Sequence, residues 1–328
     1  MSKLVTIYGG SGFVGRYVAR RMAKLGWRVR VAVRRPNQAL FVKPYGVPGQ
    51  VEPVLCNIRD EASLRAALRG ADAVVNCVGT FSRYGRNNFE AVQAEGAGRI
   101  ARIAAEEGVA HLVHLSAIGA DPQGDSLYAK SKAAGEKAVL EAFPTAVILR
   151  PSVIFGNGDG FFNKFAGMAV MAPVLALPHA TTRFQPVYVE DVAFAAVKGI
   201  TGEAAPGIYE LGGPEAASLK EILNRMLPVI QRRRLILGIP AFLARIPAWG
   251  LDMVEALTFG LIRNKIVTRD QITMLAQDNV VGASARGLSD LDIQPTAFEA
   301  VLPEYLWRFR PSGQYAAIKA SARNLRKV

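Results

Sequence analysis

A glycine-rich turn near the N-terminus constrains the fold of this 328-residue chain more than any other feature. The segment YGGSGFVG follows an apolar run typical of a β-strand and opens a stretch with the apolar spacing of a helix. Gly10, Gly12 and Gly15 have the G-x-G-x-x-G spacing, which allows a tight turn, a close approach of the backbone to a pyrophosphate, and close helix–strand packing. The sequence therefore predicts a dinucleotide-binding unit. The residues that we expect around the phosphates are Gly9, Gly10, Ser11, Gly12, Phe13, Val14 and Gly15.

Short runs rich in β-branched residues alternate with amphipathic segments through the first half of the chain. This alternation predicts an α/β fold, a doubly wound parallel sheet of the Rossmann type with helices on both faces. The expected strands are Leu4–Tyr8, Arg28–Val33, Val51–Leu55, Ala73–Asn76, His111–Leu115 and Ala146–Leu149. The expected helices are Phe13–Leu25, Ala62–Leu68, Asn88–Glu107 and Tyr128–Phe143.

The second half of the chain has a looser pattern. The segments QPVYVEDVAFAAVKG and GIYELGG predict a strand–helix pair and a strand that both return to the main sheet. We therefore expect a Rossmann domain over residues 1–160 and 184–212, and a smaller, mostly helical C-terminal lobe over residues 161–183 and 213–310 that closes over the cofactor. A basic, extended tail should follow over residues 311–328.

The end of the second expected strand indicates which dinucleotide is preferred. An acid at this position would bind the adenosine ribose of NAD, whereas arginine accommodates the 2′-phosphate of NADP. The strand ends VAVRRP, with Arg34 and Arg35 and no acid nearby, which favours NADPH (NADP). The alternative is a solvated basic strand end.

Two further strand ends supply candidate cofactor contacts. Asn57 and Ile58 follow the third strand and are placed to meet the adenine edge and face. Val78 and Gly79 follow the fourth strand, where a glycine allows the backbone to approach the ribose and nicotinamide. A structural role for Asn57 is equally compatible with the sequence.

Taken together, the glycine turn, NCVG and YAKSK resemble the extended or atypical branch of the short-chain dehydrogenase/reductase superfamily, over roughly residues 1–214. The resemblance implies that Tyr128 is the acid/base and that Lys132 binds the nicotinamide ribose and lowers the tyrosine pKa. The family's catalytic hydroxyl position is Ala117, with Ser116 as the alternative donor if the strand end shifts by one residue. Catalysis by Tyr128 and Lys132 is therefore left open and disfavoured.

A narrower resemblance comes from FPTAVILRPSVIFGNGDGFFNKFA and QPVYVEDVA, which are similar to the NADPH-binding accessory subunits of respiratory complex I, the NADH:quinone oxidoreductase. It implies a subunit that holds NADPH without turnover and contacts other complex I subunits where the peripheral arm meets the membrane arm. Because Met1 leads directly into the first strand, we expect a bacterial relative, peripheral on the cytoplasmic face of the inner membrane. A mitochondrial relative would lie on the matrix face.

The formal net charge of +13 favours an anionic partner. Basic side chains concentrate in residues 231–270 and 303–328, around the apolar segment Leu235–Ile262. This arrangement suits anionic lipid headgroups, and a buried core of the helical lobe is the alternative. Nucleic acid is disfavoured because no aromatic residues interleave with the basic ones.

Other function classes have little support in the sequence. The histidines are uninformative, since His111 and His114 flank the fifth strand and His179 is isolated, and with the two cysteines, Cys56 and Cys77, they give no metal-ligand pattern and no disulfide framework. No uncharged stretch reaches the roughly 20 apolar residues of a membrane span. The alternatives to a non-catalytic complex I subunit are a free-standing NADP-dependent reductase or epimerase and an NADPH redox sensor.

Overall fold

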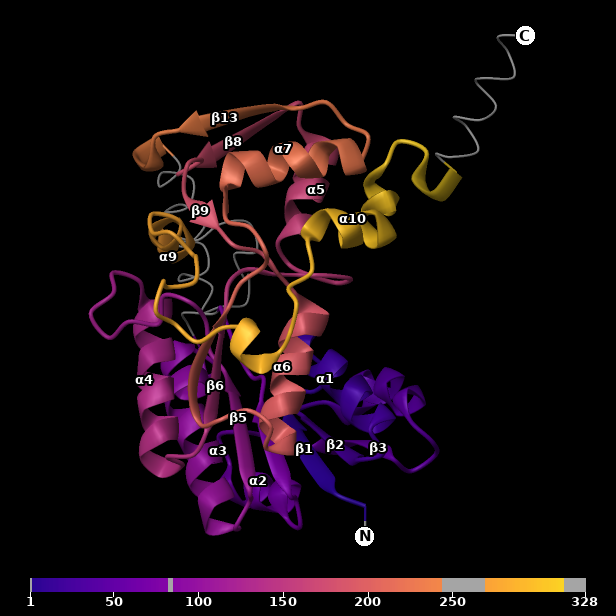
Figure 1. Cartoon of the computed structure of the whole chain (residues 1–328), viewed down its shortest axis with the longest axis vertical. Helices are drawn as coiled ribbons and strands as arrows, with labels where there is room; N and C mark the ends of the chain where they lie inside the picture. The colour runs from indigo at the N-terminus through magenta and orange to yellow at the C-terminus, as the bar shows by residue number, and fades with distance from the viewer. Residues whose placement is uncertain (1, 82–84, 244–268, 316–328) are drawn as a thin grey trace.

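A seven-stranded parallel sheet forms the centre of the structure, a computed structural model that describes residues 2–81, 85–243 and 269–315 (Figure 1). Its strand order is β11-β6-β5-β4-β1-β2-β3. The strands are β1 (Leu4–Tyr8), β2 (Arg28–Val33), β3 (Val51–Leu55), β4 (Ala73–Asn76), β5 (His111–Leu115), β6 (Val147–Pro151) and β11 (Gly207–Leu211). The order reverses beside β1, as in doubly wound dinucleotide-binding sheets, and the expected fold class is confirmed.

Helices cover both faces of this sheet because neighbouring residues of each strand point in opposite directions. Val5 and Ile7 of β1 pack in one core with α1 and α6, whereas Val74 and Leu112 pack in a second core with α2, α3 and α4. The helices are α1 (Phe13–Lys24), α2 (Glu61–Leu68), α3 (Glu95–Glu106), α4 (Leu127–Ala142) and α6 (Val189–Thr201), and a 3₁₀ segment, η1 (Pro36–Tyr45), connects β2 to β3.

The helix expected over Asn88–Glu107 has a distorted start. A π-helical turn, η2 (Glu90–Ala94), precedes α3. A Cβ atom on Gly135 of α4 would lie 2.1 Å from the carbonyl oxygen of Gln93, so the widened turn presses directly onto the neighbouring helix. Such π-helical turns commonly occur beside functional sites.

One of the two strands expected to join the main sheet from the second half of the chain does not do so, and that prediction is wrong. The segment QPVYVEDVAFAAVKG forms β10 (Val187–Tyr188) and α6, but β10 pairs with β7 (Ile154–Phe155) in a separate two-stranded ladder. Its two residues lead directly into α6, which leaves no length for a sheet strand. The segment GIYELGG does join the sheet, as β11 beside β6.

The C-terminal lobe lies beyond the carboxyl ends of the sheet strands (Figure 1). Among its described residues the helices are α5 (Phe162–Met171), α7 (Leu219–Val229), α9 (Arg269–Met274) and α10 (Phe298–Leu306), with 3₁₀ turns η3 (Ser289–Leu291), η4 (Trp307–Phe309) and η5 (Gly313–Tyr315). Short strands that sequence analysis did not anticipate join them, namely β8 (Val174–Pro178), β9 (Arg183–Phe184), β12 (Ala217–Ser218) and β13 (Leu235–Ile239). Aromatic residues such as Phe155 and Phe162 are fully buried in the lobe's core.

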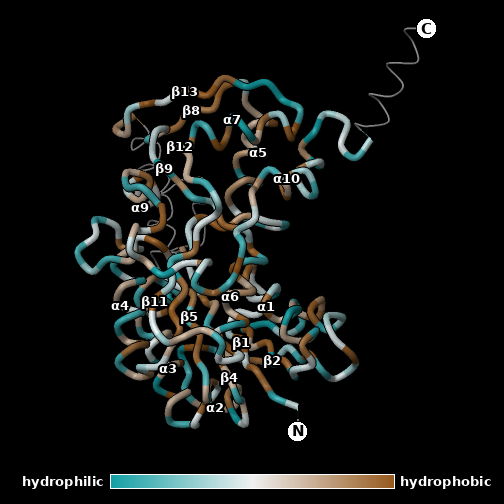
Figure 2. Tube along the Cα trace, in the orientation of Figure 1, coloured by the Kyte–Doolittle hydropathy of each residue, from teal (hydrophilic) through white to brown (hydrophobic). Residues whose placement is uncertain are grey.

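Hydrophobic residues line the sheet strands and also β8 and β13, at the end of the lobe away from the N-terminus (Figure 2). Within the described ranges, no helix has both the length and the hydrophobicity to cross a membrane. Most of the expected tail, residues 316–328, and residues 244–262 of the expected apolar segment lie outside the described residues.

Candidate functional site

The glycine turn joins β1 to α1 in a conformation that only small residues allow. Gly9 has a φ of +73°, in the left-handed region. A Cβ atom on Gly15 would lie 2.4 Å from the Gly9 carbonyl oxygen, and one on Gly10 would lie 3.0 Å from Cγ1 of Val31. The glycine spacing in the sequence therefore corresponds to a steric requirement of the turn.

The N-terminus of α1 has no anionic partner of its own. Gly12 is the N-cap residue, no side chain caps the helix, and no acid lies in its first turn. Gly12 is exposed, Ser11 and Phe13 are half-buried, and Val14 packs in the core, so that only its backbone can face a ligand. The free N–H groups and the positive end of the helix dipole suit the phosphates of a dinucleotide.

Arg34 and Arg35 lie beside this turn because the amide of Gly9 donates to the Ala32 carbonyl of β2 (3.0 Å). Both arginines are exposed, and neither forms an ion pair with a described residue. Arg30, in the same strand, instead donates to the Ala67 carbonyl (2.6 Å). The two guanidinium groups at the strand end are thus available to a phosphate outside the chain.

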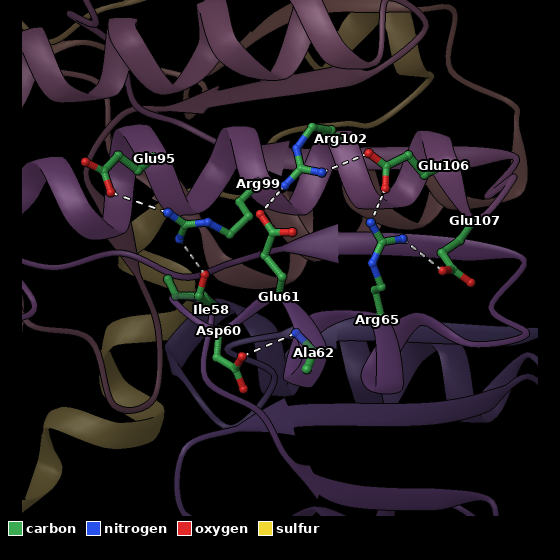
Figure 3. Close-up of polar contacts among 10 residues, drawn as sticks. All are labelled: Ile58, Asp60, Glu61, Ala62, Arg65, Glu95, Arg99, Arg102, Glu106 and Glu107. Carbon is green, nitrogen blue, oxygen red and sulfur yellow. Dashed lines mark hydrogen bonds and ion pairs between the residues drawn. The ribbon is translucent and has the colours of Figure 1, made fainter.

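The turn that carries Asn57 and Ile58 is fixed from several sides. Asn57 Oδ1 accepts from the Arg59 amide (3.2 Å), and Arg99 of α3 donates to the Ile58 carbonyl (3.0 Å; Figure 3). The Ile58 side chain packs against Gly96 of α3, where a Cβ would lie 2.9 Å from Cδ1. Ile58 is therefore half-buried and can offer an adenine ring only the part of its side chain that is turned away from α3.

Asn76, at the end of β4, organises the segment NCVG. Its Oδ1 accepts from the Val78 amide (3.1 Å), and its side chain is 2% exposed. A Cβ on Gly9 would lie 3.1 Å from the Cys77 carbonyl oxygen, so this segment and the glycine turn are in contact. A Cβ on Gly79 would meet no atom within 4 Å, which leaves open space above the backbone there.

His114 of β5 belongs to the same buried region, a position that sequence analysis considered uninformative. Its Nδ1 lies 3.1 Å from Asn76 Nδ2, and burial, aided by the positive charge of Lys132, lowers the pKa of His114 to about 3. The imidazole is therefore neutral. Because Asn76 Oδ1 already accepts from Val78, Asn76 Nδ2 donates to Nδ1 and the histidine proton is on Nε2.

Lys132 is held inside the site. Its Nζ donates to the Leu115 carbonyl at the end of β5 (3.0 Å), and its side chain is buried. Burial lowers the pKa of Lys132 to about 8, against the opposing effects of Glu136 and Cys77. Burial also raises the pKa of Cys77 to about 12, so this thiol is a poor nucleophile.

Tyr128 lies one turn before Lys132 on α4 and is enclosed by aromatic rings. Its ring stacks on Phe81, with centroids 5.2 Å apart, and meets Phe89 edge-on at 6.0 Å. Lys132 Nζ is 5.9 Å from the tyrosine ring centroid. Burial raises the pKa of Tyr128, which opposes the formation of the phenolate that acid/base chemistry would require.

Ser116 and Ala117 directly follow Leu115, whose carbonyl accepts from Lys132. Ser116 is 4% exposed, and its Oγ has no hydrogen-bond partner among the described residues. Its hydroxyl is thus the polar group available near the expected position, because Ala117 offers none. The structure therefore brings together Ser116, Tyr128 and Lys132 with the ends of β4 and β5, while Phe81, Phe89 and His114 are the members that sequence analysis missed.

No group of three or more potential metal ligands occurs in the described part of the chain. The lobe presents a different feature, an apolar outer face on the parallel pair β8–β13. Leu175, Leu177 and Ile236 point into the core of the lobe, whereas the alternate residues point outward. We call this surface the outer face, and its exposed large hydrophobic residues are Val174, Leu235 and Leu237.

Comparisons with known proteins agree with the geometry of the nucleotide site. The model of the NAD dependent epimerase/dehydratase family matches residues 5–212. The mitochondrial NADH dehydrogenase (ubiquinone) 1 alpha subcomplex subunit 9 of Arabidopsis thaliana is 33% identical over 94% of this chain and 79% of that protein. The resemblance to complex I accessory subunits is thereby confirmed.

Enzymes are also similar to the chain. A ceramide reductase of Caulobacter vibrioides is 35% identical over 58% of this chain and 58% of that protein. An Escherichia coli NADPH-dependent quinone oxidoreductase, solved with NADPH, has a TM-score of 0.70 and 19% identity over 92% of this chain and 98% of that one, a likeness of fold alone. The chain belongs to the NAD dependent epimerase/dehydratase family of extended short-chain dehydrogenases/reductases.

Proposed function

We propose that this protein is a nucleotide-holding, non-catalytic accessory subunit of respiratory complex I. One observation carries the proposal: a chain that matches a complex I subunit over 94% of its length has Ala117 where family enzymes have a catalytic hydroxyl. A donor of this kind contributes about 2.7–4 kcal/mol of transition-state stabilisation. Its absence leaves a site that can bind a dinucleotide and that is poorly equipped to use it.

Two further features of the site support holding over turnover. Burial raises the pKa of Tyr128, and the stacked ring of Phe81 covers one face of the tyrosine. Lys132 is anchored by the Leu115 carbonyl, where its role is to bind the nicotinamide ribose. When bound, the nicotinamide would supply hydride chemistry, but the residues around it act mainly to bind and enclose it.

NADPH is the proposed dinucleotide. Arg34 and Arg35 are exposed, without ion pairs to described residues, and adjacent to the glycine turn. A 2′-phosphate between them would form charge-assisted, bidentate hydrogen bonds. Since a ligand that binds only the folded state adds RT ln(1 + [L]/Kd) to the free energy of unfolding, a permanently held NADPH would stabilise the subunit.

The proposed place is the membrane-side region where the two arms of complex I meet, on the cytoplasmic face of a bacterial inner membrane or the matrix face of a mitochondrial one. Other complex I subunits are the proposed protein partners. The outer face of β8–β13, beside the exposed Arg233, is the proposed contact with anionic lipid headgroups. Basic residues near such a surface contribute about 1 kcal/mol each.

The test of function is retention without turnover. The purified chain should carry about one NADPH per molecule, identified after extraction, and should oxidise none of it when offered carbonyl, quinone or sugar-nucleotide substrates. Sustained oxidation of NADPH with any of these would contradict the proposal.

A second candidate, a free-standing NADP-dependent reductase, is favoured by the buried, unpartnered Ser116 Oγ and by the 35% identity to a ceramide reductase. It requires an activity that Tyr128→Phe abolishes while NADPH binding persists. The redox-sensor alternative requires clearly different affinities for NADPH and NADP⁺, since equal affinities shift no equilibrium.

A further inference from the structure

The helix that carries Tyr128 and Lys132 is capped by the other lobe. The hydroxyl of Ser126 accepts from the Ala129 amide (3.0 Å), which satisfies one amide of the first turn of α4. The Leu127 amide donates to Asp270 Oδ1 (2.9 Å) and the Tyr128 amide donates to Oδ2 (3.3 Å). Both carboxylate oxygens of a residue in α9 are thus used by a helix of the Rossmann domain.

Asp270 is buried and lies far along the sequence from the helix start that it caps. It is 8% exposed, and it lies 143 residues after Leu127. The first amides of a helix have no partner within the helix and form its positive end, so a carboxylate there both completes hydrogen bonds and complements the dipole. The position of the first turn of α4 therefore depends on where α9 lies.

The segment that follows α9 is attached to both domains. Thr182 of the lobe donates to the Leu275 carbonyl (2.6 Å). The side chain of Asn279 donates to the Ile118 carbonyl (3.3 Å), and Ser152 donates to Asn279 Oδ1 (2.7 Å), both in the Rossmann domain. The segment just after α9 is therefore tied both to the lobe and to the Rossmann domain.

We propose that Asp270 is a positioning residue that couples the C-terminal lobe to the nucleotide site. By holding the Leu127 and Tyr128 amides it fixes the start of α4, and thereby the stack of Tyr128 on Phe81 and the reach of Lys132 to the Leu115 carbonyl. This inference rests on the proposed nucleotide-holding function. Because coupling between sites is reciprocal, a partner that holds the lobe in place also strengthens NADPH binding, and NADPH also favours the docked lobe.

The test compares full-length variants by two measurements, amide hydrogen exchange and the Kd for NADPH on nucleotide-free protein. In Asp270→Ala we expect the Leu127 and Tyr128 amides to exchange at least about tenfold faster, because their acceptor is gone. Ala129, held by Ser126, and Val139, in the helix interior, should exchange at the parent rate. The Kd for NADPH should rise about five- to tenfold.

Two further variants separate positioning from folding. Asp270→Asn keeps one acceptor oxygen and should give intermediate exchange and an intermediate Kd. Asp278→Asn is the matched control, since Asp278 follows the same helix but accepts from the Arg183 amide of the lobe (2.8 Å), and it should change neither measurement.

Three results would overturn the coupling. The first is an Asp270→Ala variant that binds NADPH with the same Kd as the parent chain although its Leu127 and Tyr128 amides exchange fast. The second is exchange at Ala129 and Val139 that rises as much as at Leu127 and Tyr128, which would indicate a general loss of stability. The third is a parent chain that binds no NADPH, which would overturn the proposed function as well. If the parent chain binds NADPH and oxidises it, only the proposed function is overturned. The Kd of Asp270→Ala for NADPH, compared with that of the parent chain, then still decides whether the coupling exists.

Discussion

Among single residues, two arginines carry the proposed preference for NADPH. Arg34 and Arg35 lie where β2 ends beside the glycine turn, and their charges are not neutralised by any described acid. Hydrogen bonds to charged groups contribute about 1.5–3 kcal/mol each to binding. Most of the preference for NADPH over NADH should therefore come from these side chains.

The double variant Arg34→Ala, Arg35→Ala should weaken NADPH binding by roughly 100-fold or more and leave NADH binding nearly unchanged, because only NADPH has the 2′-phosphate. Titration of nucleotide fluorescence measures both affinities. Arg28→Ala, which removes an exposed charge at the opposite end of β2, is the matched control. An equal loss of affinity for both nucleotides would show that the arginines act only through general charge.

The burial of Lys132 should make the free energy of unfolding depend on pH. Burial lowers the pKa of Lys132 to about 8 in the folded chain, from 10.5 in the unfolded chain. Between these values the unfolded state binds more protons, so the free energy of unfolding rises with pH, and below pH 8 the full cost of burying the charge is present.

Relative to Lys132→Met, the nucleotide-free parent should gain roughly 2 kcal/mol of stability between about pH 8 and pH 9.5, since one pKa unit corresponds to about 1.36 kcal/mol. Denaturant unfolding at the two pH values measures this difference. Parallel pH profiles for parent and variant would contradict the burial of a titrating lysine.

At the scale of elements, two ion-pair systems fix helices in different ways. Glu136 of α4 accepts two hydrogen bonds from Arg150 of β6 (2.9 and 2.6 Å) and is 4% exposed. By contrast, Arg102 of α3 pairs with Glu61 and Glu106 on the surface (Figure 3). Exposed pairs are screened by water and contribute little, whereas a buried charge that loses its partner destabilises the fold strongly.

We therefore expect Arg150→Ala to lower the free energy of unfolding by about 3–5 kcal/mol, because it leaves Glu136 buried without its partner. Arg102→Ala should leave the urea midpoint almost unchanged. Equal effects of the two substitutions on urea unfolding would contradict the assignment of α4 as a helix held by a buried pair.

The outer face of β8–β13 predicts binding to anionic membranes. Leu235 and Leu237 are 57% and 45% exposed, which is unusual for two apolar residues on one strand. Replacing both by serine should reduce co-sedimentation with vesicles that contain anionic lipid several-fold, at unchanged thermal stability. Leu25→Ser, which changes a 56% exposed leucine at the end of α1, is the control. Unchanged sedimentation would remove the lipid contact from this face.

At the scale of the whole molecule, the sequence predicts the sheet far better than the lobe. Strands β1 to β5 have the expected bounds, because β-branched runs and glycine turns are local signals. The pairing of β10 with β7 and the short strands β8 and β13 were missed, because a few apolar residues do not reveal which distant segment they will meet.

The candidate site likewise combines residues that local sequence motifs predict with residues that only the folded structure brings together. Motifs predict the glycine turn, Arg34 and Tyr128 as site residues, since their spacing along the chain carries the signal. His114 and Asp270 have no such spacing. Their contacts with Asn76 and with the start of α4 arise only when strands and lobes are brought together in the fold.

We propose that this chain holds NADPH within complex I. The most direct measurement is to solubilise native membranes in mild detergent, separate the complexes by size, and follow the polypeptide, its extracted nucleotide and NADH:quinone oxidoreductase activity through the same fractions. We predict that the chain co-migrates with the activity and carries about one NADPH. A chain that runs alone at its own mass of 35.3 kDa, with NADP(H) that exchanges freely, would contradict the claim.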